Sequence, residues 1–369
     1  MARSRDQDAC PGALQVHQAA DGALVRVRIP GGMISAAQLL ALAEAARDLG
    51  SGSLELTSRG SLQLRGVTDT AAVAESIAGA GLLPSATHER VRNVVSSPLS
   101  GRVGGLADVR SWVADLDAAI QADPVLAGLT GRFWFSIDDG RCDVSGLRAD
   151  VGVQVVGEHV SLLLAGSDTG IRLPFYDAVP AMTTVAARFA EIRGKRWRVS
   201  ELDDLGALLG GLTPTAPPAE EFPATSRGPV GWIEQDDGRV ALGAAVPLGV
   251  LAARTAEYLA AIEAPLVITP WRTLLVCDLA EEIADVSLRV LAPLGLVFDE
   301  NSPWLDVSAC TGSPGCTHSA ADTHADAEAF IASGAAGGVH RRFVGCDRAC
   351  GSPRDAEVLI ATGDGYRPR

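Results

Sequence analysis

Residues 23–29 alternate apolar and polar side chains, which predicts a β-strand, and Pro30-Gly31-Gly32 ends it. Apolar residues at helical spacing follow up to Leu49 and predict a helix. Ser35 is a suitable N-cap for this helix and Gly50 a suitable end, because a serine hydroxyl can accept from free helix N–H groups and glycine tolerates the helix exit.

Two more strands and a second helix are predicted directly after this helix. Residues 53–57 and 61–67 have the strand pattern, and Asp69 can cap a helix that ends near Gly81. The order strand, helix, strand, strand, helix is most of a ferredoxin-like unit.

The same order of elements returns in the second half of the chain. A hairpin is predicted around Asp237-Gly238, followed by helix, strand, strand and helix. The predicted ranges are 229–233 and 239–245 for the hairpin strands, 250–262 for the first helix, 266–269 and 273–279 for the next strands, and 281–291 for the last helix.

A short internal match links the two halves. LELTSRGSLQLRGV (54–67) aligns with LVITPWRTLLVCDL (266–279), so that Thr57 falls on Thr269 and Leu62 on Leu274. We interpret this match as an internal duplication.

The segment 213–229, TPTAPPAEEFPATSRGP, is rich in Pro, Ala and Thr and is predicted to be a linker. Each half is then a ferredoxin-like unit followed by a second α/β module, which makes the fold class α+β. The predicted domains are 1–87 (first ferredoxin-like half), 88–212 (first module), 230–300 (second ferredoxin-like half) and 301–369 (second module).

Composition narrows the class of protein. The 369 residues are 47% hydrophobic and 21% charged, an ordinary globular balance, and the net charge of −14 argues against a nucleic-acid partner. Residues 1–15 lack the apolar run of a signal peptide, and no apolar run reaches membrane-spanning length. We therefore predict a cytoplasmic protein that binds neither nucleic acid nor membrane, in which clustered cysteines are metal ligands rather than disulfides.

Four of the seven cysteines form two close pairs near the C-terminus. Cys310 and Cys316 are separated by five residues, and Cys346 and Cys350 by three. Four thiolates with glycine-rich flanks are what a [4Fe-4S] cluster requires, one for each iron. A helix predicted to start at Thr317 or Ser319 would place Cys316 near its N-terminus, where the helix dipole stabilises a thiolate.

Other interpretations of the four cysteines stay open. A structural zinc site is one, although its pairs usually have shorter spacings, and four unrelated buried cysteines are another. A simple ferredoxin is disfavoured, because ferredoxins use a more compact cysteine run.

The spacing of the two cysteine pairs resembles the nitrite and sulfite reductase family. TSRGSLQLRGV (57–67), VRNVVSSP (91–98) and GRFWFSID (131–138) also resemble segments of that family. The resemblance implies duplicated ferredoxin-like halves and a cluster placed against a sirohaem. It also implies that Arg59, Arg92 and Arg132 bind the substrate.

Further residues resemble the cobalamin-biosynthesis branch of this family. Trp134 stands where the reductases have a lysine, so the pocket lacks a cation that sulfite or nitrite would need. ACPGALQVHQAADGALVRVRIPGG (9–32) and VHRRFVGCDRACGSP (339–353) resemble the branch, and Asp347 and Arg348 replace the Pro-Asn of the reductases.

This resemblance implies an iron–sulfur monooxygenase, an oxidoreductase whose substrate is the metal-free tetrapyrrole precorrin-3A. O2 would supply a hydroxyl at C20, an acetate side chain would close a γ-lactone, and NADH would provide electrons through an unidentified donor. The three arginines would hold substrate carboxylates, and Cys350 would bind the cluster only. No catalytic residue is identified. The alternatives are a sirohaem- and [4Fe-4S]-dependent sulfite or nitrite reductase and a non-enzymatic four-cysteine metal-binding protein.

The remaining histidines and cysteines receive weaker assignments. His318, His324 or His340 could bind a mononuclear non-haem iron, or could be ordinary surface or hydrogen-bonded residues. Cys10 resembles a family feature without an assigned role. Cys142 and Cys277 are predicted to be small apolar residues.

Overall fold

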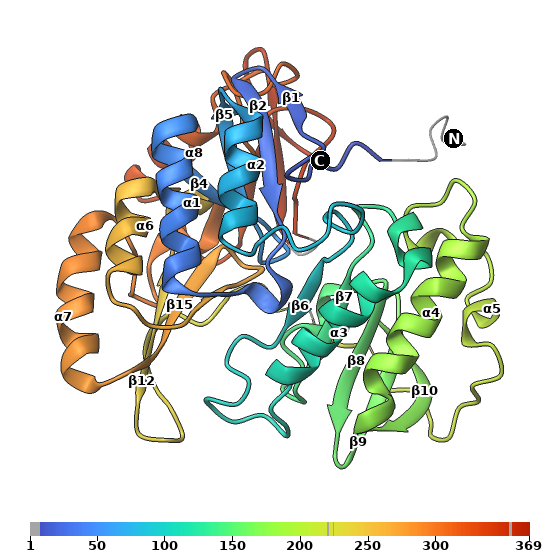
Figure 1. The fold of residues 1–369 in the computed structure, drawn as a ribbon. Helices are drawn as coiled ribbons and strands as arrows, with labels where there is room; N and C mark the ends of the chain where they lie inside the picture. The colour runs from blue at the N-terminus through green and yellow to red at the C-terminus, as the bar shows by residue number, and fades with distance from the viewer. Residues whose placement is uncertain (1–7, 220, 224, 354–355) are drawn as a thin grey trace.

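The fold is described from a computed structural model (Figure 1) that covers residues 8–219, 221–223, 225–353 and 356–369. Residues 1–7 of the N-terminal segment, and residues 220 and 224 of the predicted linker, lie outside the described residues. In the described part the strands form four sheets. None of the helices found there combines the length and the apolar character needed to cross a membrane.

The first sheet has the strand order β1-β2-β5-β4-β13. Its N-terminal strands are β1 (His17–Ala19), β2 (Gly22–Val27), β4 (Ser53–Leu56) and β5 (Leu62–Val67). Helices α1 (Ala36–Leu49) and α2 (Thr70–Gly79) belong to the same half. Both caps are confirmed, since Ser35 forms a capping box with Gln38 and Asp69 accepts from two N–H groups of α2.

The second ferredoxin-like half has the strand order β11-β12-β15-β14-β3. Its strands and helices are β11 (Gly231–Glu234), β12 (Val240–Ala245), α6 (Ala253–Ala260), β14 (Leu266–Ile268), β15 (Thr273–Leu279) and α7 (Glu281–Leu291). The predicted hairpin is therefore present, with its first strand shifted by about two residues, and α7 has the predicted bounds.

The two halves exchange a strand. β3 (Met33–Ile34) of the first half pairs with β14, and β13 (Val250–Ala252) of the second half pairs with β4. The prediction of a helix over 250–262 is thus wrong at its start, because residues 250–252 gain sheet hydrogen bonds to the other half. The apolar core under both sheets is continuous.

The duplication predicted from the sequence is confirmed by the strand register. Leu54 pairs with Leu64 in the first half, and Leu266 pairs with Val276 at the matching place in the second. In each half the aligned threonine, Thr57 or Thr269, uses its Oγ1 to accept from two backbone N–H groups of the turn that follows.

The first module is a five-stranded sheet of order β10-β9-β8-β7-β6. β6, β7 and β8 run parallel, and β8, β9 and β10 are antiparallel. Its elements are β6 (Val94–Ser96), α3 (Arg110–Ala122), β7 (Phe135–Asp138), β8 (Val151–Val156), β9 (His159–Leu164), β10 (Ser167–Pro174), α4 (Ala178–Ile192) and α5 (Gly206–Leu209).

The second module repeats this plan with fewer strands. β16 (Val307–Ala309), β17 (Arg341–Val344) and β18 (Glu357–Thr362) run parallel, and β19 (Gly365–Pro368) is antiparallel to β18. The loops after β7 and after β17 therefore occupy equivalent places, and the second of them carries Cys346 and Cys350.

The predicted helix after Cys316 begins later than expected. α8 spans Thr323–Ala332 and is capped by Asp322, which accepts from the N–H groups of His324 and Ala325. Ser319 instead donates to the carbonyl of Ala321 in a local turn. The placement of Cys316 at a helix N-terminus is therefore wrong.

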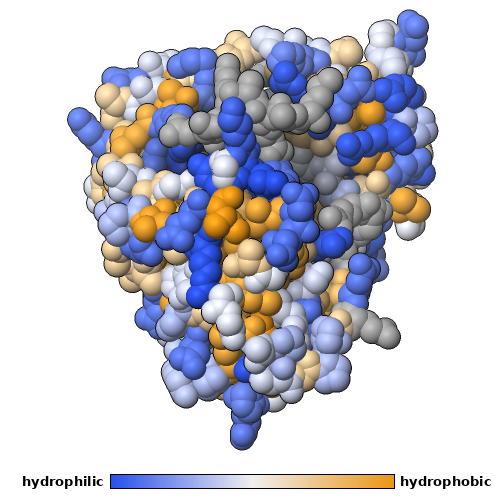
Figure 2. All heavy atoms as spheres, turned by 90° about the vertical axis from the view of Figure 1, so that its right-hand side faces the viewer, coloured by the Kyte–Doolittle hydropathy of each residue, from blue (hydrophilic) through white to orange (hydrophobic). Residues whose placement is uncertain are grey.

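No helix or strand occurs in the described residues of the predicted linker, 213–229. Its first part lies beside β10, because the N–H groups of Thr215 and Ala216 donate to the carbonyl of Gly170. Figure 2 shows the face that carries the first module: hydrophobic residues gather near its middle and hydrophilic residues surround them.

Candidate functional site

The first sheet has one apolar face and one polar face. On β2, Val25 and Val27 point into the core, whereas Arg26 alternates to the opposite side. On β5, Gln63 and Arg65 also point away from the core, to the same side as Arg26. Because this polar face is turned toward the C-terminal module, it forms the wall of a cavity between the two.

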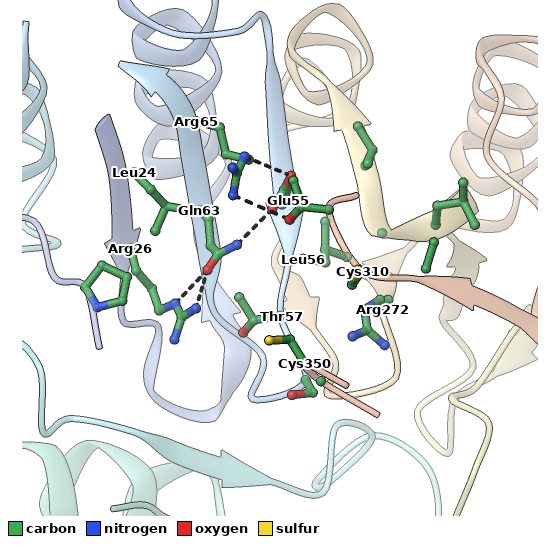
Figure 3. Close-up of a pocket in the computed structure, with 18 of the residues that line it drawn as sticks. Leu24, Arg26, Glu55, Leu56, Thr57, Gln63, Arg65, Arg272, Cys310 and Cys350 are labelled. Carbon is green, nitrogen blue, oxygen red and sulfur yellow. Dashed lines mark hydrogen bonds and ion pairs between the residues drawn. The ribbon is translucent and has the colours of Figure 1, made fainter. Parts of the chain in front are cut away.

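A chain of hydrogen bonds crosses this polar face (Figure 3). Arg26 donates from Nε to Gln63 Oε1 over 2.8 Å, and Gln63 Nε2 donates to Glu55 Oε2 over 2.9 Å. Arg65 Nε lies 3.7 Å from Glu55 Oε1. The network holds Arg26 and Arg65 in fixed positions on this wall, on either side of Gln63 and Glu55.

Arg65 also binds the loop of the first cysteine pair. It forms a bidentate ion pair with Asp21, at 2.8 and 2.9 Å, and donates from Nη2 to the carbonyl of Gly315 over 2.9 Å. Its Nη1 lies 3.5 Å from Thr311 Oγ1. Arg65 was not among the residues predicted for the site, since nothing in the sequence indicates that β5 meets residues 311–315.

Two adjoining cavities meet at this loop. The arginine cavity, of about 280 Å³, is lined by side chains from both halves and both cysteine pairs, among them Arg26, Arg65, Arg272, Arg342 and Cys350. The cysteine cavity, of about 390 Å³, is lined by Cys310, Cys316, Cys346 and Cys350 together. The two cavities share His17, Arg65, Cys310, Thr311 and Cys350.

The four predicted ligands are thus brought to one cavity. Within the residues described, however, no three histidine, cysteine, aspartate or glutamate side chains lie close enough together to hold a single metal ion. Burial, and then the neighbouring Cys346, Cys310 and Cys316, raise the pKa of Cys350. Thiolates that raise one another's pKa in this way are stabilised by bound cations.

One backbone N–H and one side-chain hydroxyl contact the sulfur of Cys310. The N–H of Gly345 donates to Cys310 Sγ over 3.2 Å, and Thr323 Oγ1 lies 3.9 Å from the same sulfur. A Cβ at residue 345 would overlap the hydroxyl of Ser319, so only glycine fits this close approach. The N–H donation is the type of bond that stabilises metal-bound thiolate sulfur.

Two guanidinium groups converge beside Cys350. A Cβ at Gly351 would lie 3.1 Å from Arg342 Nη2 and 3.3 Å from Arg272 Nη2. Arg342 is only 3% exposed; its Nη2 donates to the carbonyl of Cys350, and its Nε and Nη1 have no hydrogen-bond partner in the described residues. Burial, and then the charge of Arg272, lower the pKa of Arg342.

Neither of these arginines forms an ion pair with a carboxylate among the described residues. A buried cation beside a second, half-buried one is costly without a compensating anion. An iron–sulfur cluster held by four thiolates carries net negative charge and would provide that compensation. The residues present therefore fit the negative charge of the cluster predicted from the cysteine spacing.

The three predicted substrate arginines lie elsewhere, and none of them lines either cavity. Arg92 is 5% exposed and forms a bidentate ion pair with Asp117, at 2.6 and 2.8 Å. Arg59 donates to the carbonyl of Gly131 over 3.2 Å, and Arg132 stacks over Trp197 at 5.0 Å. Arg59 and Arg132 thus meet at one loop, and Arg92 is engaged within the first module.

Trp134 is 6% exposed and packs with Val95, Val144 and Ala149. The guanidinium of Arg59 lies 5.6 Å from its ring centroid and that of Arg198 lies 5.9 Å from it. A tryptophan ring close to two cations is stabilised by cation–π attraction. Trp134 therefore attracts the cationic side chains of Arg59 and Arg198 but contributes no positive charge itself.

The three candidate histidines do not converge. His324 lines the arginine cavity, His318 lines the cysteine cavity, and His340 Nε2 is 2.8 Å from Ser308 Oγ. Burial lowers the pKa of His324. Cys277 is fully buried among apolar residues, as predicted, whereas Cys142 accepts from Gln154 Nε2 over 2.8 Å.

Comparisons with known proteins agree with this architecture. Residues 17–77 match the nitrite/sulfite reductase ferredoxin-like half domain. Over 98% of its length the chain is 29% identical to a precorrin-3B synthase from Sinorhizobium sp, 82% of which is covered. A stretch of 127 residues, 32% of the chain, is 35% identical to a ferredoxin–nitrite reductase from Synechococcus elongatus, of which it covers 25%.

The fold is similar to that of the Mycobacterium tuberculosis NirA protein. The TM-score is 0.77 at 19% identity, over 94% of this chain and 73% of the other, a likeness that concerns the fold alone. The α+β, reductase-like fold predicted from the sequence is therefore confirmed. The predicted resemblance to the nitrite and sulfite reductase family, and within it to precorrin-3B synthase, is confirmed as well.

Proposed function

We propose that this chain is an enzyme acting on a tetrapyrrole, with the activity of a precorrin-3B synthase. In this reaction O2 supplies a hydroxyl group at C20 of precorrin-3A, and an acetate side chain closes a γ-lactone. The second oxygen atom leaves as water, with electrons that come from NADH through a separate donor. The observation that carries the proposal is the meeting of an arginine-lined cavity with all four paired cysteines.

The arginine cavity suits a ligand with several carboxylates. Arg26 comes from the first sheet, Arg272 from the turn between β14 and β15, and Arg342 from β17. Arg65 also lines the cavity, but its donors are held by Asp21 and Gly315. Guanidinium groups bind carboxylates by paired hydrogen bonds. Cations on several sides of a cavity can therefore fix a macrocycle that carries acetate and propionate groups around its edge.

The proposed cluster ligands are Cys310, Cys316, Cys346 and Cys350, and a [4Fe-4S] cluster held there would supply one-electron transfer. The chain contributes the Gly345 N–H to the first thiolate and the charges of Arg342 and Arg272 beside the last. His324 lines the arginine cavity, and burial lowers its pKa. An imidazole at this place can exchange a proton with a bound ligand.

Arg59, Arg92 and Arg132 stay predictions as substrate contacts. Of these, Arg59 is the best placed, because it is partly exposed and adjoins the segment of residues 9–11 that borders the arginine cavity. Arg92 would first have to leave Asp117, which holds two of its donors.

A sirohaem-dependent nitrite or sulfite reductase is the second candidate function. The 35% identity to a ferredoxin–nitrite reductase over 127 residues favours it. Trp134 counts against it, since a neutral ring takes the place of a lysine in the anion-binding segment that the chain resembles.

An absorption spectrum of protein purified without oxygen separates the two functions. The proposal predicts one broad visible band with about four iron and four sulfide per chain, and loss of both in Cys346→Ser. Cys142→Ser is the matched control and keeps them, because Cys142 lies outside both cavities. Stoichiometric sirohaem bands would instead establish the reductase, and a colourless protein carrying zinc would exclude both functions.

A further inference from the structure

Cys10 lies outside the two cysteine pairs, and its sulfur is surrounded by arginines. Arg26 Nη1 donates to Cys10 Sγ over 3.2 Å, and Arg28 Nη2 donates over 3.3 Å. The segment is held in place because Glu89 accepts from the N–H groups of Ala13 and Leu14. The thiol is thus fixed against two guanidinium groups and is still partly accessible to solvent.

Arg28 provides a second, independent feature of this place. It is only 2% exposed, and its Nε and Nη1 have no hydrogen-bond partner among the described residues. Buried donors without an acceptor are rare in folded proteins and cost stability. They therefore mark a place for a small ligand that accepts hydrogen bonds next to the sulfur.

The charges facing Cys10 come from several elements. Arg26 and Arg28 extend from β2 and the residue after its end, Arg59 lies in the turn between β4 and β5, and Asp8 on the same segment accepts from the Cys10 N–H. Burial would raise the pKa of Cys10, and so does Asp8, but the charges of Arg28, Arg26 and Arg59 outweigh both and lower it. The thiolate is the reactive form of cysteine.

We propose that Cys10 and Arg28 form a peroxide-reactive thiolate site at the border of the arginine cavity. The Cys10 thiolate attacks one oxygen of hydrogen peroxide, the S–O bond forms and the O–O bond breaks. The sulfur is oxidised to a sulfenic acid, and the peroxide is reduced to water as the departing hydroxide takes a proton. The unused donors of Arg28 stabilise the negative charge on the leaving oxygen.

Peroxide treatment of the full chain at pH 6.5, with a sulfenic-acid trap and peptide mass spectrometry, tests this site. Cys10 is the single cysteine of the tryptic peptide 6–26, so its labelling is read separately. We expect Cys10 to react at least about tenfold faster than Cys142, whose pKa is raised by burial and by Asp138.

Variants separate an activated thiolate from a thiol that is merely exposed. Arg28→Met should lower the Cys10 rate by about tenfold or more, and Arg28→Lys should recover only part of it, because lysine retains the charge without the two extra donors. If Arg28→Met does not fold, Arg26→Gln gives the same comparison at a less buried position. Equal rates for Cys10 and Cys142, or unchanged rates in these variants, would overturn the proposal.

Discussion

Arg65 connects the polar face of the first sheet to the loop of the first cysteine pair through Asp21 and Gly315. At the scale of residues, the sequence was sufficient to predict the four cysteines as cluster ligands, because their spacing is local and can be seen along the chain. It did not predict Arg65, Arg272 or Arg342, because these residues reach the site only through the packing of segments that are distant in sequence. It also assigned Arg92 to the substrate, although Arg92 is engaged by Asp117.

Arg65→Met tests the connection between the sheet and the cysteine loop. Loss of the bonds to Asp21 and Gly315 should lower the free energy of unfolding by about 1–3 kcal/mol. It should also speed iron loss to a chelator, because the loop of Cys310 and Cys316 is less constrained. Arg47→Met is the control, since Arg47 is half exposed on α1 and binds Asp48 and Glu257, away from the cysteine loop. Equal chelation rates in both variants would contradict the role of Arg65.

Arg342→Met tests the proposed counter-charge beside Cys350. A nearby cation favours the reduced, more negative cluster, so its removal should lower the reduction potential measured by EPR-monitored titration. Arg341→Met is the matched control: it changes the neighbouring residue of β17, whose guanidinium binds Glu357 instead. A potential that shifts equally in both variants, or in neither, is incompatible with this assignment.

At the scale of elements, the equivalent loops of the two modules are stabilised by different chemistry. The loop after β7 folds around Asp138, which is fully buried and accepts from the N–H groups of Gly140, Cys142, Val144 and Ser145. The loop after β17 carries Cys346 and Cys350 in the corresponding place. One copy of the duplicated loop therefore supports the fold, and the other supplies the proposed ligands.

Asp143→Asn tests the electrostatics of the first of these loops. Burial, and then Asp138, raise the pKa of Asp143 to about 7. This folded-state pKa lies above the unfolded value, so the fold favours the protonated carboxyl group. The resulting stabilisation is complete below about pH 4 and is lost as the pH rises through 7.

The Asp143→Asn variant should therefore be more stable than the original protein at pH 8, by about 2–4 kcal/mol. This gain should vanish near pH 4. Chemical unfolding at the two pH values measures the difference, and a gain that is the same at both would refute the account.

Helix and strand predictions succeeded where the signal is local. Ser35, Asp69 and the Asp237-Gly238 turn act through neighbouring backbone groups, and each lies where it was expected. The prediction failed at 250–252, which pair with β4 of the other half, and at the start of α8, where Asp322 provides the cap. Pairing with a strand that is distant in sequence produces no local periodicity, so it cannot be predicted from one sequence.

At the scale of the whole molecule, the two ferredoxin-like halves are joined by the exchange of β3 and β13. The crossing is tight near Gly32, which has a φ of +69° and lies against the carbonyl oxygen of Ile268. The duplication itself could be predicted from the aligned segments, but the exchange could not, because either half could have completed its own sheet.

Gly32→Ala should destabilise the whole protein. The added Cβ would overlap Ile268 and the backbone would be strained, so we expect a loss of about 2–4 kcal/mol in the free energy of unfolding. Gly52→Ala is the control: Gly52 has a φ of +80° with nothing within 4 Å of an added Cβ, so it reports the strain alone, about 1 kcal/mol. Equal losses would show that the crossing is not tight.

The measurement that tests the proposed function most directly is a single turnover under isotopic oxygen. The anaerobically purified protein, supplied with electrons, is incubated with precorrin-3A and then exposed to ¹⁸O₂, and the product is analysed by mass spectrometry. The account predicts a hydroxylated γ-lactone that contains one ¹⁸O atom. Unchanged precorrin-3A, or a product whose new oxygen comes from water, would contradict it.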